Sequence, residues 1–105
     1  MIRAKVYKNR NNDVYAFKIK EHGDPIVCAA VSLLSLNTIN SVDKFTQQVF
    51  THSIDNGGFL TFECKSDTVD KEAALLLNSL LLGLVGIEES YPMDIKLTVK
   101  HNKTQ

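Results

Sequence analysis

Short strand-like runs that alternate with two long helix-like segments constrain the fold of this chain most strongly. Apolar and polar residues alternate over residues 2–7 and 14–19, which predicts a β-hairpin with a polar turn. A second hairpin is predicted over residues 51–64, because the Asn-Gly-Gly sequence at residues 56–58 tolerates the positive φ of a tight turn. A final strand is expected over residues 94–100.

The two longer segments have the apolar spacing of helices. The first, residues 25–50, follows an Asp-Pro pair, in which Asp is a favoured N-cap and Pro a favoured first helical residue. The second, residues 69–90, follows possible capping groups at residues 66–68 and ends before a proline. Residues 101–105 are expected to be a frayed tail.

The resulting order, ββαββαβ, predicts the fold class. We expect an α+β two-layer sandwich in which both helices cover one face of a largely antiparallel sheet, with residues 1–105 as a single domain. The second helical segment is apolar on more than one side. One side can lie on the sheet, and the other is expected to pack against a second copy of the chain.

Charge and composition exclude several classes of function. Lys+Arg and Asp+Glu are 12 each, and a formal net charge of zero predicts no direct nucleic-acid binding. The first residues are not apolar, and the longest apolar-rich run, residues 73–87, is too short for a membrane span, so we expect a cytoplasmic protein. The two cysteines are expected to be reduced, and no motif predicts a metal or a cofactor.

Cys28 is the strongest catalytic candidate. It lies about one turn into the first predicted helix, where unpaired backbone N–H groups and the helix dipole favour a thiolate. The same N–H groups could stabilise an oxyanion. The alternative is a buried structural cysteine, since free Cys is among the most buried residue types. Cys64 shares a strand face with Leu60 and Phe62 and is expected in the core.

Three polar residues near Cys28 could complete a site. His22 lies on the preceding loop and could act as a general base if that loop folds back over the helix start; otherwise it is a solvated histidine. Asp24 could cap the helix or orient His22. Ser32, one turn beyond Cys28, could line a substrate groove or simply donate to a backbone carbonyl.

Residues 26–32, Ile-Val-Cys-Ala-Ala-Val-Ser, resemble the ribosomal-processing cysteine protease family, called Prp. The Asn-Gly-Gly-Phe sequence at residues 56–59 and the second helical segment, up to the Tyr-Pro pair at residues 91–92, are also similar to that family. The resemblance therefore covers nearly the whole chain.

The resemblance implies a bacterial cysteine endopeptidase. Members of this family remove the short, hydrophobic N-terminal extension of a large-subunit ribosomal protein, the twenty-seventh by name, and are homodimers. By this resemblance Cys28 is the nucleophile and a loop histidine is the general base and acid. Ser32 would contact the substrate, together with Gly23 and Asp24 on the loop over the site.

The loop before Cys28 departs from the family pattern. The family's catalytic histidine belongs to a Gly-His-Ala motif, whereas this chain reads Glu-His-Gly around His22. Either His22 is the base on a shortened loop, or loop residues that carry the base are missing between Lys20 and Glu21. The family's acidic residue three positions before the cysteine is Pro25 here, with Asp24 displaced by one position.

A second class of function stays open beside the protease. A chain without a positioned histidine could bind an extended peptide in the same groove, or dimerise through the second helix, as a non-catalytic module associated with ribosome assembly. A small redox protein is disfavoured, because the sequence contains no Cys-x-x-Cys motif.

Overall fold

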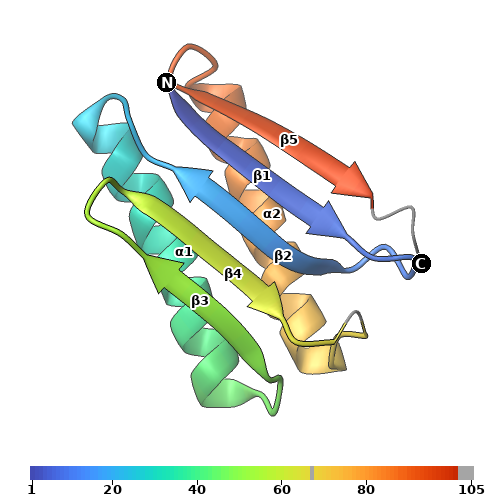
Figure 1. Cartoon of the computed structure of the whole chain (residues 1–105). Coiled ribbons are helices and arrows are strands. Elements are labelled where there is room, and N and C mark those ends of the chain that lie inside the picture. Colours follow the sequence, from blue (N-terminus) through green and yellow to red (C-terminus); the bar gives the residue numbers. More distant parts are fainter. Residues whose placement is uncertain (67, 102–105) are drawn as a thin grey trace.

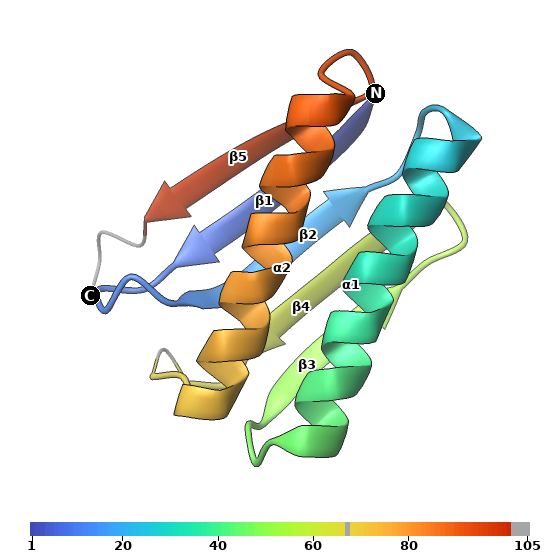
Figure 2. The same cartoon turned by 180° about the vertical axis from the view of Figure 1, so that it is seen from behind.

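The computed structural model describes residues 1–66 and 68–101, which form two layers: a five-stranded sheet and two helices on one of its faces (Figures 1 and 2). The order ββαββαβ and the α+β sandwich are confirmed. Asp67 and residues 102–105, on which part of the expected cap and tail fall, lie outside the described residues. The elements are β1 (Ile2–Lys8), β2 (Val14–Lys20), α1 (Pro25–Phe45), β3 (Phe50–Ile54), β4 (Phe59–Cys64), α2 (Lys71–Ser90) and β5 (Ile95–His101).

The sheet has the strand order β3-β4-β2-β1-β5. The pairs β1–β2, β2–β4 and β3–β4 are antiparallel, and β1–β5 is parallel, so the sheet is largely antiparallel as predicted. Figure 1 shows the face of the sheet that carries no helix, and Figure 2 shows both helices lying side by side on the other face. The chain therefore has an open sheet face and a covered one.

The first helix ends earlier than the sequence predicts. It stops at Phe45 instead of residue 50, because Thr46 adopts an extended conformation and both its N–H and its Oγ1 donate to the carbonyl of Val42, at 3.2 and 2.7 Å. The following residues lead directly into β3. The second helix begins at Lys71 instead of residue 69, since Asp70 has the non-helical angles of an N-cap.

The core lies between the sheet and the helices. Phe62 is its centre: its ring stacks on Phe17 at 5.1 Å and contacts Phe50 at 4.8 Å. Cys64 is buried there, as predicted. Val99 pairs with the buried Val6 and so lies on the core side of β5, but it is 39% exposed. Helix α2 crosses the sheet obliquely and does not cover the second half of the edge strand β5 (Figure 2).

Both helices are long and apolar enough to cross a membrane by length and composition alone. Core helices of soluble proteins pass the same test, so this finding is weak evidence for a span. Each helix here buries one face on the sheet. The expectation of no membrane segment stays a prediction.

Candidate active site

The start of α1 is fixed by Asp24. Its side chain accepts hydrogen bonds from the N–H groups of Ile26 and Val27, at 2.9 and 3.3 Å, and its carbonyl accepts from the N–H of Cys28 at 2.9 Å. Pro25, the first helical residue, has no N–H to donate. Of its two possible roles, Asp24 therefore performs the helix cap.

This cap changes the expected oxyanion site. The sequence predicts free N–H groups in the first turn of α1, but those of Ile26, Val27 and Cys28 are already bonded to Asp24. The prediction that the helix start itself supplies these donors is wrong for this structure. In the part of the chain that the structure describes, the N–H groups of His22 and Gly23 donate no hydrogen bond, so free donors lie in the loop instead.

Cys28 is half-buried, at the edge of the core. Its thiol makes no hydrogen bond with any described residue. It differs from Cys64, which is 4% exposed and lies inside the core. Burial, reinforced by the charges of Asp70 and Glu63, raises the pKa of the Cys64 thiol to about 12. Of the two cysteines, Cys28 is therefore the more exposed.

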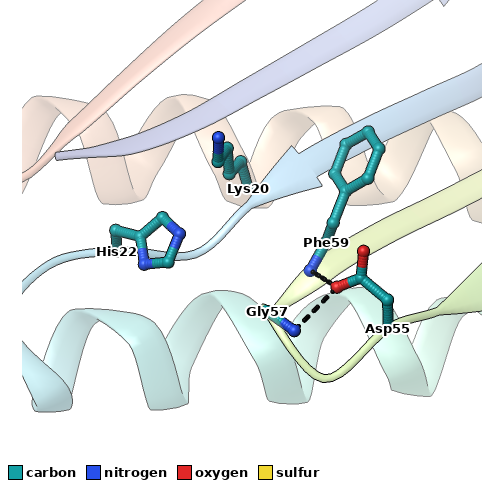
Figure 3. Close-up of a pocket in the computed structure, with 5 residues that line it drawn as sticks. All are labelled: Lys20, His22, Asp55, Gly57 and Phe59. Atoms are coloured by element: carbon teal, nitrogen blue, oxygen red, sulfur yellow. Dashed lines mark hydrogen bonds between the residues drawn. The ribbon is translucent and has the colours of Figure 1, made fainter.

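His22 lies in a different environment. It is exposed and lines a hollow of about 390 Å³ with Lys20, Asp55, Gly57 and Phe59, beside the β3–β4 turn (Figure 3). Lys20 and Phe59 are paired across β2 and β4 and point toward the open face, since their neighbours on each strand face the core. Cys28 does not line this hollow.

The structure thus does not pair His22 with Cys28. Among the described residues, no hydrogen bond joins the two side chains. Sequence proximity alone suggested that they could meet, but the loop directs His22 toward the end of β2 and the β3–β4 turn (Figure 3). A role for His22 in proton transfer therefore requires this loop to rearrange.

Ser32 has a partner that the sequence did not indicate. Its Oγ donates to Oε2 of Glu21 at 3.2 Å, so it does not donate to a backbone carbonyl. The N–H of Glu21 donates to the carbonyl of Gly58 at 3.0 Å. Glu21 thereby connects the β3–β4 turn to α1, one helical turn from Cys28. The period of β2 is the signal that could have found it, because Phe17 and Ile19 face the core and residue 21 continues that side.

The second carboxylate oxygen of Glu21, Oε1, is buried and has no hydrogen-bond partner among the described residues. A buried unpaired carboxylate oxygen is unfavourable, typically by about 1–3 kcal/mol. The Glu21 carboxylate therefore has spare capacity to accept a hydrogen bond beside Ser32.

No group of three or more His, Cys, Asp or Glu side chains gathers within the described residues in a way that could hold a metal. The absence of metal and cofactor stays a prediction. The chemistry available from the chain itself is nucleophilic attack by the Cys28 thiol, next to a hydroxyl held by a carboxylate.

Known proteins are similar to this chain in both sequence and fold. The model of the family described as Cysteine protease Prp matches residues 1–96. The ribosomal processing cysteine protease Prp of Staphylococcus aureus is 37% identical over 82 residues, which is 76% of each chain. Its counterpart in Bacillus subtilis is 26% identical over 111 residues, 93% of this chain and 96% of that one. A crystal structure of the S. aureus essential protease Prp with a covalently linked product peptide has a TM-score of 0.87 at 28% identity, over 95% of this chain and 100% of that one.

Proposed function

Because this chain belongs to the cysteine protease Prp family, we propose that it removes the short hydrophobic N-terminal extension of a large-subunit ribosomal protein, the twenty-seventh by name. The observation that carries the proposal is Cys28, a half-exposed thiol in the first turn of α1. Relatives named ribosomal processing cysteine proteases, and a related structure that holds a covalently linked product peptide, support it. We propose that residues 1–105 act as one such domain in the cytoplasm.

The proposed reaction passes through a thioester on Cys28. The thiolate attacks the carbonyl carbon of the scissile bond and forms a tetrahedral oxyanion. When this intermediate collapses, the C–N bond breaks and the leaving amine takes a proton. Water then attacks the thioester, releases the extension as a carboxylate and restores the thiol.

The loop between β2 and α1 would supply the oxyanion donors. Since Asp24 occupies the N–H groups of the first helical turn, we assign this role to the N–H groups of His22 and Gly23. Both residues are exposed and lie next to the capping residue. Donors aimed at the developing charge typically contribute about 100- to 1,000-fold in rate.

We propose that His22 serves as the general base and acid after this loop closes. In the structure its side chain lines the hollow beside the β3–β4 turn, so closure must bring it to Cys28 when peptide binds. The other explanation is that loop residues are missing from the sequence. An intact mass well above 11.7 kDa would support that explanation, and a mass of 11.7 kDa would leave His22 as the loop's histidine.

Ser32 and the loop residues Gly23 and Asp24 would contact the substrate. The carboxylate of Glu21 holds the partly buried Ser32 hydroxyl, whose oxygen can still accept an N–H of an extended peptide. This arrangement lies one helical turn from the proposed nucleophile. It would position the peptide without taking part in bond breaking.

The protein is proposed to act as a homodimer. Both helices carry exposed apolar side chains with the same spacing of seven and then three residues on the side away from the sheet. Because the helices lie side by side (Figure 2), we treat these exposed side chains together as one outer apolar surface, here called the helix-layer surface. Its members are Ile26, Leu33, Leu36, Leu75, Leu82 and Val85. A surface of this kind is typical of a protein interface.

Peptide cleavage tests the proposed activity. A synthetic peptide that spans the hydrophobic extension should be cut by the wild-type chain and not by Cys28→Ala. Cys64→Ala, which removes the buried thiol, is the matched control and should retain cleavage. Undiminished cleavage by Cys28→Ala would refute the proposal that Cys28 makes this chain a cysteine protease.

The same assay addresses the alternative, a non-catalytic peptide-binding or dimerisation module. The specific observation in its favour is that no histidine is hydrogen-bonded to Cys28 within the described residues. If the wild-type chain binds the peptide in a titration but never cleaves it, the binding module is the better description.

A further inference from the structure

The open face of the sheet is mostly basic, with Glu63 on β4 as the one acidic residue among the described strands. Side chains that alternate with core residues point out from β1, β2 and β5, and six of the exposed ones are cations. Six is half of the 12 Lys and Arg in the chain. We call this set of side chains the basic sheet face; Figure 1 is viewed from that side of the sheet. It consists of Arg3, Lys5, Lys18, Lys20, Lys96 and Lys100.

The register places all of these cations except Lys100 directly opposite another cation. Arg3 pairs with Lys20 on one side and with Lys96 on the other, and Lys5 pairs with Lys18. Like charges opposite each other across a sheet are destabilising. None of the six forms an ion pair with another described residue, so the fold does not neutralise them. Their arrangement therefore has no structural benefit to the chain alone.

Aromatic rings accompany the cations. A hollow of about 310 Å³ in this face is lined by four of the cations together with Tyr7 and Phe59. Nζ of Lys18 lies 5.8 Å from the centre of the Tyr7 ring, and Phe59 is 38% exposed. Adjacent strands are about 5 Å apart, and alternate residues along a strand about 7 Å. The basic sheet face thus combines regularly spaced cations with two aromatic rings.

We propose that the basic sheet face binds single-stranded RNA. The cations contact phosphates, and Tyr7 and Phe59 stack on bases, which is how flat sheets and charged grooves hold single strands. The choice of RNA over DNA rests on the proposed function, in which the substrate is a ribosomal protein. An anionic membrane fits less well, because lipid binding combines cations with several apolar side chains. The exposed aliphatic stripes lie on the helices, on the opposite side.

Binding to a labelled twelve-nucleotide RNA of mixed sequence, followed by fluorescence anisotropy, tests the proposal. The protein carries Cys28→Ala, so that binding is measured without cleavage. Each phosphate contact contributes about −0.7 to the slope of log affinity against log salt. With four contacts, affinity should fall about 50-fold between 50 and 200 mM salt. DNA of the same sequence and vesicles of phosphatidylglycerol are the comparison ligands.

Two double variants distinguish the effect of charges on the basic sheet face from the effect of the protein's net charge. Lys5→Glu with Lys18→Glu should weaken RNA binding about tenfold or more at 50 mM salt and flatten the salt slope. Lys44→Glu with Lys71→Glu, on the exposed sides of α1 and α2, changes the net charge equally and should leave the affinity within about twofold.

A single variant controls for misfolding. Lys5→Glu creates an opposite-charge pair with Lys18, so the Tm should stay the same or rise while RNA binding weakens. The proposal is overturned if the helix variant loses as much affinity as the sheet variant. It is also overturned if no RNA binds at 50 mM salt, if only the vesicles bind, or if DNA binds more tightly than RNA. None of these outcomes depends on peptide cleavage, so the two proposals fail separately.

Discussion

The two cysteines show how a residue's surroundings decide its chemistry. Cys64 is buried on β4, and its burial, with the charges of Asp70 and Glu63, raises its pKa to about 12. Near neutral pH that thiol stays protonated and unreactive. Cys28 is only half-buried and lies in the first turn of α1. Accessibility, not sequence context alone, distinguishes the proposed nucleophile from the structural thiol.

The raised pKa of Cys64 predicts a loss of stability in alkali. The unfolded thiol ionises near its ordinary pKa of 9.0, whereas the folded thiol ionises only near 12. The stability that the protonated Cys64 thiol contributes to the fold is therefore fully present below pH 9 and is lost as the pH rises toward 12. The free energy of unfolding, measured in urea, should fall more between pH 8 and 10.5 for the wild type than for Cys64→Ala. Equal pH dependence in the two proteins would contradict this.

Two serines of α1 make a matched pair. Ser32 donates to Glu21, whereas Oγ of Ser35 is buried and has no partner among the described residues. Ser32→Ala should destabilise the fold by about 1–2 kcal/mol, because it leaves the Glu21 carboxylate without its donor. Ser35→Ala removes an unpaired buried hydroxyl and should be neutral or stabilising by about 1 kcal/mol. Thermal unfolding of both variants checks the prediction, and similar Tm shifts would refute it.

At the scale of elements, local signals predicted most of the fold. Strand periods, helical apolar spacing and the Asp-Pro helix start together predicted the elements, and the structure places the N-cap of α1 at Asp24. The end of α1 was missed because its stop depends on the extended backbone of Thr46, which no glycine or proline signals. The sequence alone likewise could not show that Asp24 would use the free N–H groups beside Cys28.

The candidate site was harder to predict than the fold. Distance along the chain suggested that His22 could reach Cys28, but the side on which a loop residue lies depends on the tertiary arrangement of β2 and the β3–β4 turn. Glu21 was overlooked for a related reason. Its bonds to Ser32 and Gly58 join residues 11 and 37 positions away, from 21 to 32 and from 21 to 58.

The β3–β4 turn offers a test at this scale. Gly58 has a φ of +78°, and a Cβ there would lie 3.2 Å from the carbonyl oxygen of Glu21. Gly58→Ala should destabilise the fold by about 1–2 kcal/mol, since the new side chain strains the turn that holds Glu21. Gly57→Ala is the control, because Gly57 lacks a positive φ and its Cβ would meet only Asp55 at 3.4 Å. Equal unfolding midpoints in denaturant would contradict this reading of the turn.

At the scale of the whole molecule, polar and apolar surfaces are segregated. The basic sheet face lies on one side, and the helix-layer surface lies on the other. A net charge of zero, averaged over the chain, led to the prediction of no nucleic-acid binding. The total charge does not show this separation, because acidic side chains cancel the cations of the sheet in the sum. Apart from Glu63 on β4, the acidic residues that the structure describes lie on the helices and loops.

The proposed homodimer is tested on the helix-layer surface. Leu82, one of its members, is 74% exposed, and Leu82→Lys should convert the dimer to a monomer of 11.7 kDa, because a lysine cannot be buried there without a partner. Met93 is 83% exposed but lies outside the helices, so Met93→Lys should leave the dimer intact. Sedimentation velocity measures both. A wild-type monomer at all concentrations, or a dimeric Leu82→Lys, would contradict the proposed interface.

The central claim is that Cys28 is the nucleophile of a peptide-binding site, and alkylation tests it most directly. The folded protein is treated with iodoacetamide near pH 7, and labelling of each cysteine is followed by mass spectrometry with and without the extension peptide. Cys28 should be labelled at least about tenfold faster than Cys64, and the peptide should protect only Cys28. Equal rates for the two thiols, or no protection of Cys28 by the peptide, would contradict the claim.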